Sequence, residues 1–174
     1  MKKTIIASMV SLAAISMFAS YATAATGQVK FLGAVTATTC ALTPTVSGSG
    51  NSIIQLPDAA TNGAGTPVTF TLKADATSGC TGLTAAQTAT ISWMGDLNNK
   101  GFMNQGGSAT DAWVKLTTVN SKTTPQQDIT SANQSTDFGG DTIKTDGAQF
   151  KAVLNGGATA GDFRSVAAFA VAYK

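Results

Sequence analysis

The sequence contains no histidine and no glutamate, and its nine acidic side chains are all aspartates. General acid–base catalysis and metal binding both rely on these missing residue types. No G-x-S-x-G, G-x-G-x-x-G or P-loop pattern occurs, and the spacing of Asp137 and Asp141 does not match a calcium-binding loop. The sequence therefore predicts neither an enzyme nor a protein with a metal or another cofactor.

Positive charge is scarce too, and part of it lies in a segment that we expect to be removed. Lys2 and Lys3 precede an apolar run over residues 4–18, and Ala22-Thr23-Ala24 forms an A-x-A cleavage site. This pattern predicts a secretory signal peptide over residues 1–24. A membrane anchor is disfavoured because the run is shorter than the roughly 20 residues that span a bilayer.

The remainder of the chain carries no net charge. Of the 11 basic residues, two lie in the signal peptide, which leaves 11 − 2 = 9 against nine aspartates. A formally neutral chain argues against an electrostatic grip on nucleic acid or acidic lipid.

Only two cysteines are present, Cys40 and Cys80. An even number of cysteines in an exported chain predicts one disulfide. A redox pair favours C-x-x-C spacing, and a metal site needs more ligands than two thiols. In the loop-entropy model, such a crosslink stabilises the fold by about 3–4 kcal/mol.

Short runs that alternate between apolar and polar residues, separated by turn signals, predict strands rather than helices. The sequence shows no helical periodicity over ten or more residues, and its pattern is weak over residues 126–146. Pro44 and the following Ser/Gly cluster indicate a loop. Six or seven strands of this kind predict an all-β sandwich of immunoglobulin type. We expect strands over residues 35–41, 52–56, 68–73, 88–93, 113–119, 149–154 and 163–174.

The two ends of the expected mature chain are the most regularly patterned segments. Near the N-terminus, one face carries Ala25, Gly27, Val29, Phe31 and Gly33. In the last strand, one face carries Phe163, Ser165, Ala167, Phe169, Val171 and Tyr173, and the other face is largely apolar as well. A strand buried on both faces normally has a neighbour on each edge, so the last strand requires a second partner. The N-terminal segment is either such a partner for another molecule or a first strand in its own sheet.

Both ends carry motifs at characteristic distances from the chain's end and from Cys40. Gly161 is the fourteenth residue from the C-terminus and Tyr173 the penultimate one, and the segment between them alternates. The run from Gly27 to Gly33 is followed seven residues later by Cys40. These features resemble the subunits of chaperone–usher pili, and the resemblance covers the whole mature chain.

The resemblance implies an immunoglobulin-like sandwich that lacks its seventh strand and is completed by a donor strand from a neighbouring subunit. The implied divisions are a signal peptide (1–24), a donor-strand extension (25–34) and a pilin domain (35–174). The donor positions would be Ala25, Gly27, Val29, Phe31 and Gly33. The acceptor groove and chaperone-binding strand would use Gly161, Phe163, Ser165, Ala167, Phe169, Val171, Tyr173 and Lys174.

The same resemblance implies the partners. They are further copies of the chain in a filament, a periplasmic chaperone, an outer-membrane usher and a tip adhesin or host glycan. The chain would pass through the periplasm to the cell surface. We therefore expect a structural subunit of a fimbria, the repeating major one, which contributes to adhesion.

Two other functions remain open at this point. The chain is an adhesive major subunit if it binds host glycans itself, through Phe102, Asn104 and Lys100 in a polar loop, whereas we expect Trp93 and Trp113 to lie in the core. A secreted free binding module is the other alternative, and it predicts a stable monomer.

Overall fold

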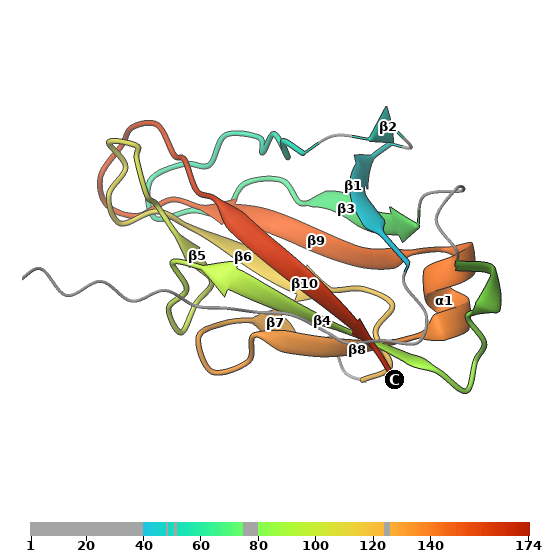
Figure 1. Ribbon diagram of the computed structural model, residues 1–174. Coiled ribbons are helices and arrows are strands. Elements are labelled where there is room, and N and C mark those ends of the chain that lie inside the picture. The colour runs from blue at the N-terminus through green and yellow to red at the C-terminus, as the bar shows by residue number, and fades with distance from the viewer. Residues whose placement is uncertain (1–39, 48, 51, 75–79, 124–125) are drawn as a thin grey trace, which may run out of the picture. The chain divides into compact units, whose positions relative to one another are not determined.

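A computed structural model describes residues 40–174 apart from residues 48, 51, 75–79 and 124–125 (Figure 1). The expected signal peptide, the donor positions and the expected strand over 35–39 lie outside the described residues. The described residues belong to one compact unit. No helix among them is long and apolar enough to cross a membrane.

The larger of two antiparallel sheets forms one layer of the fold (Figure 1). Its strands follow the order β2-β1-β3-β9-β6-β5, and β7 also pairs with β6. Their bounds are Ser49–Gly50 (β2), Leu42–Val46 (β1), Val68–Ala74 (β3), Ala148–Asn155 (β9), Trp113–Thr118 (β6), Phe102–Met103 (β5) and Asp128–Ile129 (β7).

The smaller sheet has the order β10-β4-β8, with β4 in the middle. The strands span Ala167–Tyr173 (β10), Thr88–Gly95 (β4) and Ser135–Gly139 (β8). A 3₁₀ turn over Cys80–Gly82 (η1) and a six-residue helix over Gly140–Thr145 (α1) complete the described elements.

The core lies between the two sheets, where alternate side chains from both layers meet. Trp93 of the smaller sheet packs edge-on against Phe150 of the larger one, with ring centroids 5.2 Å apart. Phe150 in turn contacts Phe70 and Phe138, at 5.7 and 5.5 Å. Such aromatic pairs stabilise the fold beyond the area that they bury. This packing of antiparallel sheets confirms the predicted all-β, immunoglobulin-like class.

The strands expected over residues 68–73, 88–93, 113–119 and 149–154 are confirmed as β3, β4, β6 and β9. The strand expected over 52–56 is wrong, since this segment forms no strand and lies along a groove. Pro44 lies inside β1 rather than in a loop. Proline is tolerated there because β1 pairs with β2 only at Thr45 and Val46, which leaves Pro44 at an edge.

The weakly patterned stretch over residues 126–146 contains three elements that the sequence does not indicate, namely β7, β8 and α1. Ile129, Phe138 and Ile143 are its apolar residues, and each is completely buried. Elements this short bury only one or two side chains each, so they leave no readable period.

Candidate functional site

A long groove opens beside the last strand of the smaller sheet, with a volume of about 820 Å³. One side consists of β10 and the segment that leads into it, and the other includes Pro44 and residues 52–56. Core side chains from the larger sheet form its floor, among them Phe70, Leu72, Val114, Leu116, Ala152 and Leu154. The groove therefore gives access to the hydrophobic core along one edge of the sandwich.

The backbone along this groove is open, and the pairing of β10 with β4 shows which groups are involved. In an antiparallel pair, alternate residues direct their N–H and C=O groups toward the partner strand. Lys174 and Thr88 exchange both bonds, at 2.9 and 2.8 Å, so the even-numbered residues of β10 face β4. The backbone N–H and C=O groups of the odd-numbered residues point away from β4, toward the side on which the groove lies. We call this row the open edge, and it comprises Phe163, Ser165, Ala167, Phe169, Val171 and Tyr173.

No backbone N–H or C=O group of the open edge has a hydrogen-bond partner among the described residues. The hydrogen bonds between β10 and β4 are made by the even-numbered residues of β10. The side chains of Phe163, Phe169, Val171 and Tyr173 are half-buried and pack against the core. Phe169 lies 5.6 Å from the ring of Trp93. The edge thus combines unpaired polar backbone with an apolar wall, which is an unstable combination for an isolated sheet.

Two buried polar side-chain atoms lack a hydrogen-bond partner in the described part of the chain, Trp93 Nε1 and Ser165 Oγ. Both residues line the groove. Buried polar groups are normally paired, and an unpaired one costs about 1–3 kcal/mol. Within the described residues, the groove therefore contains buried polar groups without hydrogen-bond partners as well as uncovered apolar surface.

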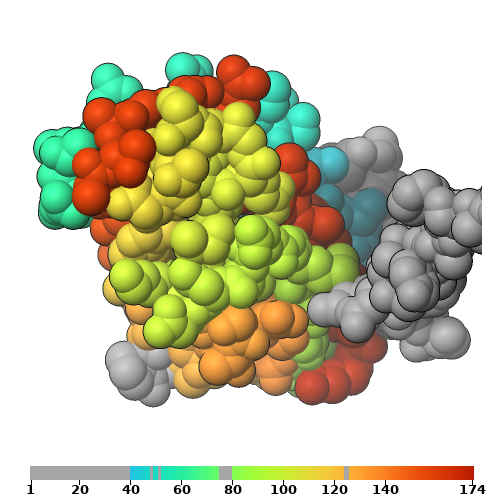
Figure 2. Space-filling model, turned by 90° about the vertical axis from the view of Figure 1, so that its left-hand side faces the viewer, coloured from blue at the N-terminus to red at the C-terminus, as the bar shows by residue number. Residues whose placement is uncertain are grey.

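β10 begins four residues later than the strand expected from the sequence, at Ala167 instead of Phe163. The preceding residues 162–166 are bound instead to the loop over residues 104–109. The backbone N–H of Ala109 donates to Asp162 O at 3.1 Å, and Ser108 Oγ donates to the Asp162 carboxylate at 2.7 Å. Figure 2 shows the red-orange surface of this segment against the yellow surface of the loop before β6.

Gly161 makes this close approach possible. Its φ of +158° is a conformation that other residues rarely adopt, and a Cβ there would collide with Ser108 Oγ. A Cβ on Gly107, in the facing loop, would collide with the backbone oxygen of Asp162. The predicted importance of Gly161 thus has a physical basis in the structure, because only glycine lets loop and segment meet.

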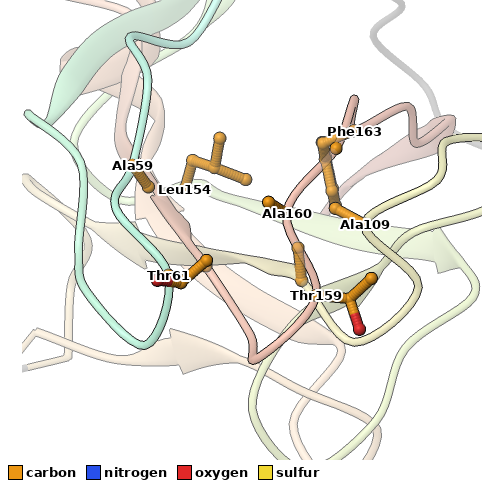
Figure 3. A pocket seen from close by; sticks show the side chains of 10 residues that line it. Ala59, Thr61, Ala109, Leu154, Thr159, Ala160 and Phe163 are labelled. Atoms are coloured by element: carbon orange, nitrogen blue, oxygen red, sulfur yellow. The ribbon is translucent and has the colours of Figure 1, made fainter.

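A smaller cavity of about 180 Å³ adjoins the groove near Gly161. Figure 3 shows Ala59, Leu154, Ala160 and Phe163 among the side chains around it. Small side chains dominate this lining, so the cavity can take a small apolar group.

Two carboxylates fix the loop that closes this end. Asp111 accepts hydrogen bonds from the backbone N–H groups of Ala158 and Thr159, at 2.5 and 3.1 Å. These bonds lower the pKa of Asp111. The hydrogen bonds from Ser108 likewise lower the pKa of Asp162.

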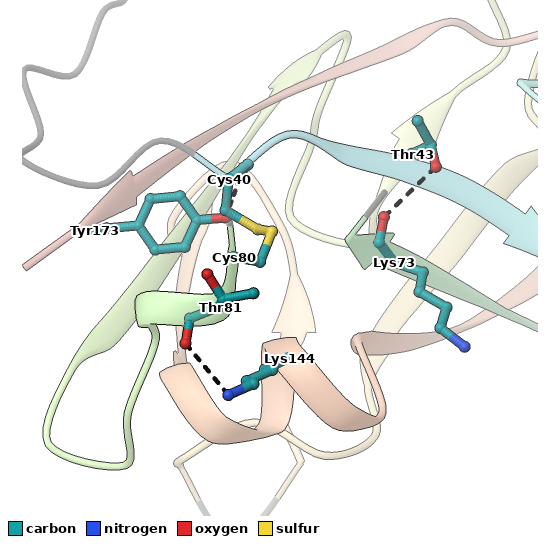
Figure 4. The surroundings of a disulfide bond; sticks show 7 residues. All are labelled: Cys40, Thr43, Lys73, Cys80, Thr81, Lys144 and Tyr173. Atoms are coloured by element: carbon teal, nitrogen blue, oxygen red, sulfur yellow. Dashed lines mark hydrogen bonds between the residues drawn. A yellow bond between two sulfur atoms is a disulfide. The ribbon is translucent and has the colours of Figure 1, made fainter. Parts of the chain in front are cut away.

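The disulfide predicted between Cys40 and Cys80 is present (Figure 4). It lies at the far end of β10, where the hydroxyl of Tyr173 donates to the backbone oxygen of Cys40 at 2.8 Å. Burial raises the pKa of Tyr173 to about 12. The end of β10 is therefore tied to the point at which the described chain begins.

The three residues expected to contact a glycan do not form an exposed aromatic platform. Phe102 is only 4% exposed and packs on Trp93 at 6.1 Å, so the expectation of an accessible ring in a polar loop is wrong. Asn104 uses its side chain to bind the backbone of its own loop. Lys100 is exposed, with its Nζ 5.9 Å from the centroid of Trp113. Trp93 lies in the core as expected, whereas Trp113 is only half-buried.

Of the residues expected in the acceptor strand, Gly161, Phe163, Ser165, Ala167 and Phe169 line the groove. Val171 and Tyr173 continue β10 beyond that lining, and exposed Lys174 follows them. Sequence reasoning missed three contributors, namely residues 53–56, Asp111 and the amide side chains of Asn104 and Gln105. No sequence signal marks them, because each acts through contacts with residues far away in the chain.

The described part of the chain is a two-sheet β-sandwich with an apolar groove beside one edge of the smaller sheet. No family model matches the chain. It is 46% identical to the F107 fimbrial protein of Escherichia coli over 165 residues, which is 95% of this chain and 96% of that protein. It is 35% identical to the K99 fimbrial protein of Escherichia coli over 189 residues, covering 99% of both chains.

The chain belongs to the family of bacterial fimbrial proteins. It is a structural subunit of a fimbria that contributes to adhesion, and it is exported to the cell surface. Members of this family are structural proteins that assemble into filaments of subunits.

Proposed function

We propose that the subunit polymerises by donor-strand exchange. In this mechanism, residues 25–33 of one copy lie in the groove of the next and pair with its open edge. The observation that carries the proposal is the row of backbone groups from Phe163 to Tyr173 that have no partner among the described residues. The part of this row up to Phe169 lines a groove of about 820 Å³. Adding a strand to such an edge supplies main-chain hydrogen bonds, while alternate side chains enter the groove.

The alternation of the N-terminal segment suits this groove. Val29 and Phe31 are the large apolar residues at the donor positions, and each contributes roughly 1.5–3 kcal/mol if fully buried. Ala25, Gly27 and Gly33 place small groups at the other positions. Because donor and groove are different surfaces, the contact is heterologous and does not close on itself, which generates a filament.

We also propose that the groove binds other proteins transiently before the subunit is assembled. An exposed apolar edge favours aggregation, so the groove must be occupied by another protein until the subunit is assembled. We assign that role to a strand of a periplasmic chaperone, which also contacts the end of the chain at Lys174. An outer-membrane usher then exchanges this strand for residues 25–33 of the next subunit. The subunit acts without catalysis of its own and without a cofactor.

Deleting residues 25–33 tests the mechanism. The deletion leaves the groove unaltered, so the variant should still be recovered in a complex with a periplasmic protein but should form no filaments by electron microscopy. A matched control deletes no residue and instead replaces Lys30, which lies between the donor positions, with Ala. Filaments formed by the deletion variant would rule out this donor strand.

A further inference from the structure

Residues 162–166 continue the line of β10 beyond the end of its partner strand. β4 ends at Gly95, which is paired with Ala167, so no strand lies opposite Arg164 and Val166. Even so, their sheet-facing backbone groups are all bonded. Such groups are normally satisfied by a neighbouring strand, so their partners here need an explanation.

Two amide side chains take the place of that strand. Gln105 Oε1 accepts from the N–H of Val166 at 3.1 Å, and Gln105 Nε2 donates to Val166 O at 3.3 Å. These are the two bonds that a facing strand residue would exchange. The backbone N–H of Gln105 donates to Arg164 O at 2.7 Å, and Asn104 Oδ1 accepts from the N–H of Arg164 at 3.1 Å.

Asn104 is itself held in place by its own loop. Its Nδ2 donates to the backbone oxygens of Gly107 and Ala109, at 2.9 and 2.7 Å. Its Oδ1 also accepts from the N–H of Gly107 at 2.9 Å. The amide that contacts Arg164 is thus fixed by three further bonds, which makes it a rigid support.

The opposite side of the segment is open. Phe163 and Ser165 direct their backbone groups toward the groove, and Ser165 Oγ is buried without a hydrogen-bond partner among the described residues. We propose that Asn104 and Gln105 are positioning residues for assembly. They hold residues 162–166 extended, so that the incoming strand pairs with Phe163 and Ser165 as well as with β10. This inference rests on the proposed donor-strand mechanism.

The physical advantage is preorganisation. A segment already held in the extended conformation loses little conformational freedom when a strand pairs with it. Without the two amides, that ordering cost falls on the assembly step, and the end of the inserted strand frays. The arrangement lengthens the usable edge without lengthening the sheet.

Quenched hydrogen exchange of assembled filaments of the full-length subunit tests this role, read residue by residue by mass spectrometry. In wild-type filaments we expect slow exchange at Phe163 and Ser165 as well as at Ala167, Phe169 and Val171. In Gln105→Leu filaments, exchange at Phe163 and Ser165 should become about fivefold to tenfold faster, while the β10 positions stay unchanged.

Gln134→Leu is the matched control. It removes an exposed glutamine whose side chain makes a single hydrogen bond among the described residues, to Ser131 O at 3.5 Å, and which precedes β8 and does not line the groove. Its filaments should exchange like wild type. If Gln105→Leu forms no filaments, Gln105→Glu gives the same readout with a smaller change, because it keeps the acceptor for the Val166 N–H.

The outcomes separate the two proposals. Rapid exchange at Phe163 and Ser165 in wild-type filaments, with slow exchange along β10, overturns the positioning role and leaves donor-strand exchange intact. Faster exchange at Arg164 and Val166 alone in the variant also overturns it, since that indicates a purely local contact. Rapid exchange at Ala167, Phe169 and Val171 in wild-type filaments contradicts donor-strand exchange itself.

Discussion

The smaller sheet has two outer edges, and they are built in opposite ways. At β8, the backbone oxygen of Asp137 accepts a bond from the N–H of Lys122 at 2.8 Å, and Ser135 and Asp137 present polar side chains. Along β10 and the segment that leads into it, six residues leave their backbone groups unpaired within the described chain, beside an apolar groove. Natural sheets usually protect their edges with charge, short strands or covering loops.

The contrast teaches where the assembly surface lies. The β8 edge is protected by a bond from Lys122 and by polar side chains, which shows that this fold can protect an edge. The other edge has no strand paired with it among the described residues, and its apolar side chains pack against the core. We therefore regard the open edge as the surface that defines this subunit, and the following experiments test the difference between the two edges.

The largest effect is expected from the core that both edges share. Phe150→Ala removes a ring that contacts Phe70, Trp93 and Phe138, and it should lower the free energy of unfolding by about 3–5 kcal/mol. Denaturant unfolding of the purified subunit measures this loss. Phe163→Ala, at the half-buried margin of the groove, should cost clearly less. Equal losses would mean that the groove wall is as essential to the fold as the core.

The second test exploits the alternation of β10 with a pair of proline variants. Ala170→Pro removes an N–H that faces β4, so it should destabilise the subunit. Val171→Pro removes an N–H that faces the groove, so it should leave the subunit folded and reduce filament yield, because proline is tolerated at an unpaired edge. Thermal unfolding and electron microscopy distinguish the two. The assignment of the open edge is wrong if Ala170→Pro is the better tolerated variant.

Acid should loosen the end of the groove that Asp111 and Asp162 hold in place. The pKa values of Asp111 and Asp162 are lowered by hydrogen bonds from Ala158 and Ser108. A lowered pKa means that the stabilisation is present above the ordinary value of 3.8 and is lost as the pH falls through the folded-state pKa. Thermal midpoints should therefore decline below about pH 4.

Asp111→Ala should flatten part of this decline and lower the midpoint at neutral pH. Asp96→Ala serves as the control, because the exposed carboxylate of Asp96 makes no hydrogen bond among the described residues. A pH profile of Asp111→Ala that superimposes on wild type would contradict the role of this carboxylate.

The smallest effect concerns the end of β10. Tyr173→Phe deletes the bond to Cys40 O and should cost about 1 kcal/mol of unfolding free energy. Tyr173 is also the one tyrosine outside the expected signal peptide, so ultraviolet titration of the mature protein should give a midpoint of about 12. Because this pKa is raised, stability should fall as the pH rises from the ordinary value of 10.0 toward it. A midpoint near 10 would mean that the hydroxyl is exposed.

The sequence was most informative where alternation is strict. The period of two over residues 163–173 correctly predicts that Phe163, Phe169, Val171 and Tyr173 pack against the core. The expected burial of both faces is wrong, since Val166 and Ala168 on the other face are exposed, as is Ala167. The matching pattern at the other end of the chain indicates the family. The disulfide followed from the number of cysteines and the predicted export. Each of these features is local or depends on a count.

The features that escaped prediction depend on contacts between distant residues. Gln105 binds Val166 across 61 positions, and Asp111 binds Ala158 across 47, with no periodic signal at either end. Phe102 and Met103 are surrounded by polar residues and glycines, so nothing in the sequence distinguishes a buried Phe102 ring from an exposed one. β10 begins at Ala167 instead of the expected Phe163 for the same reason. Before Ala167, the side chains of Asn104 and Gln105 take the place of a strand partner.

Photo-crosslinking from the donor segment tests the central claim most directly. A photoreactive residue in place of Phe31, in filaments assembled from mixed light and heavy isotope-labelled subunits, reports which residues it touches and in which copy. Donor-strand exchange predicts crosslinks between copies that map to residues 163–173. Crosslinks confined to one copy, or mapped to β8, would contradict it.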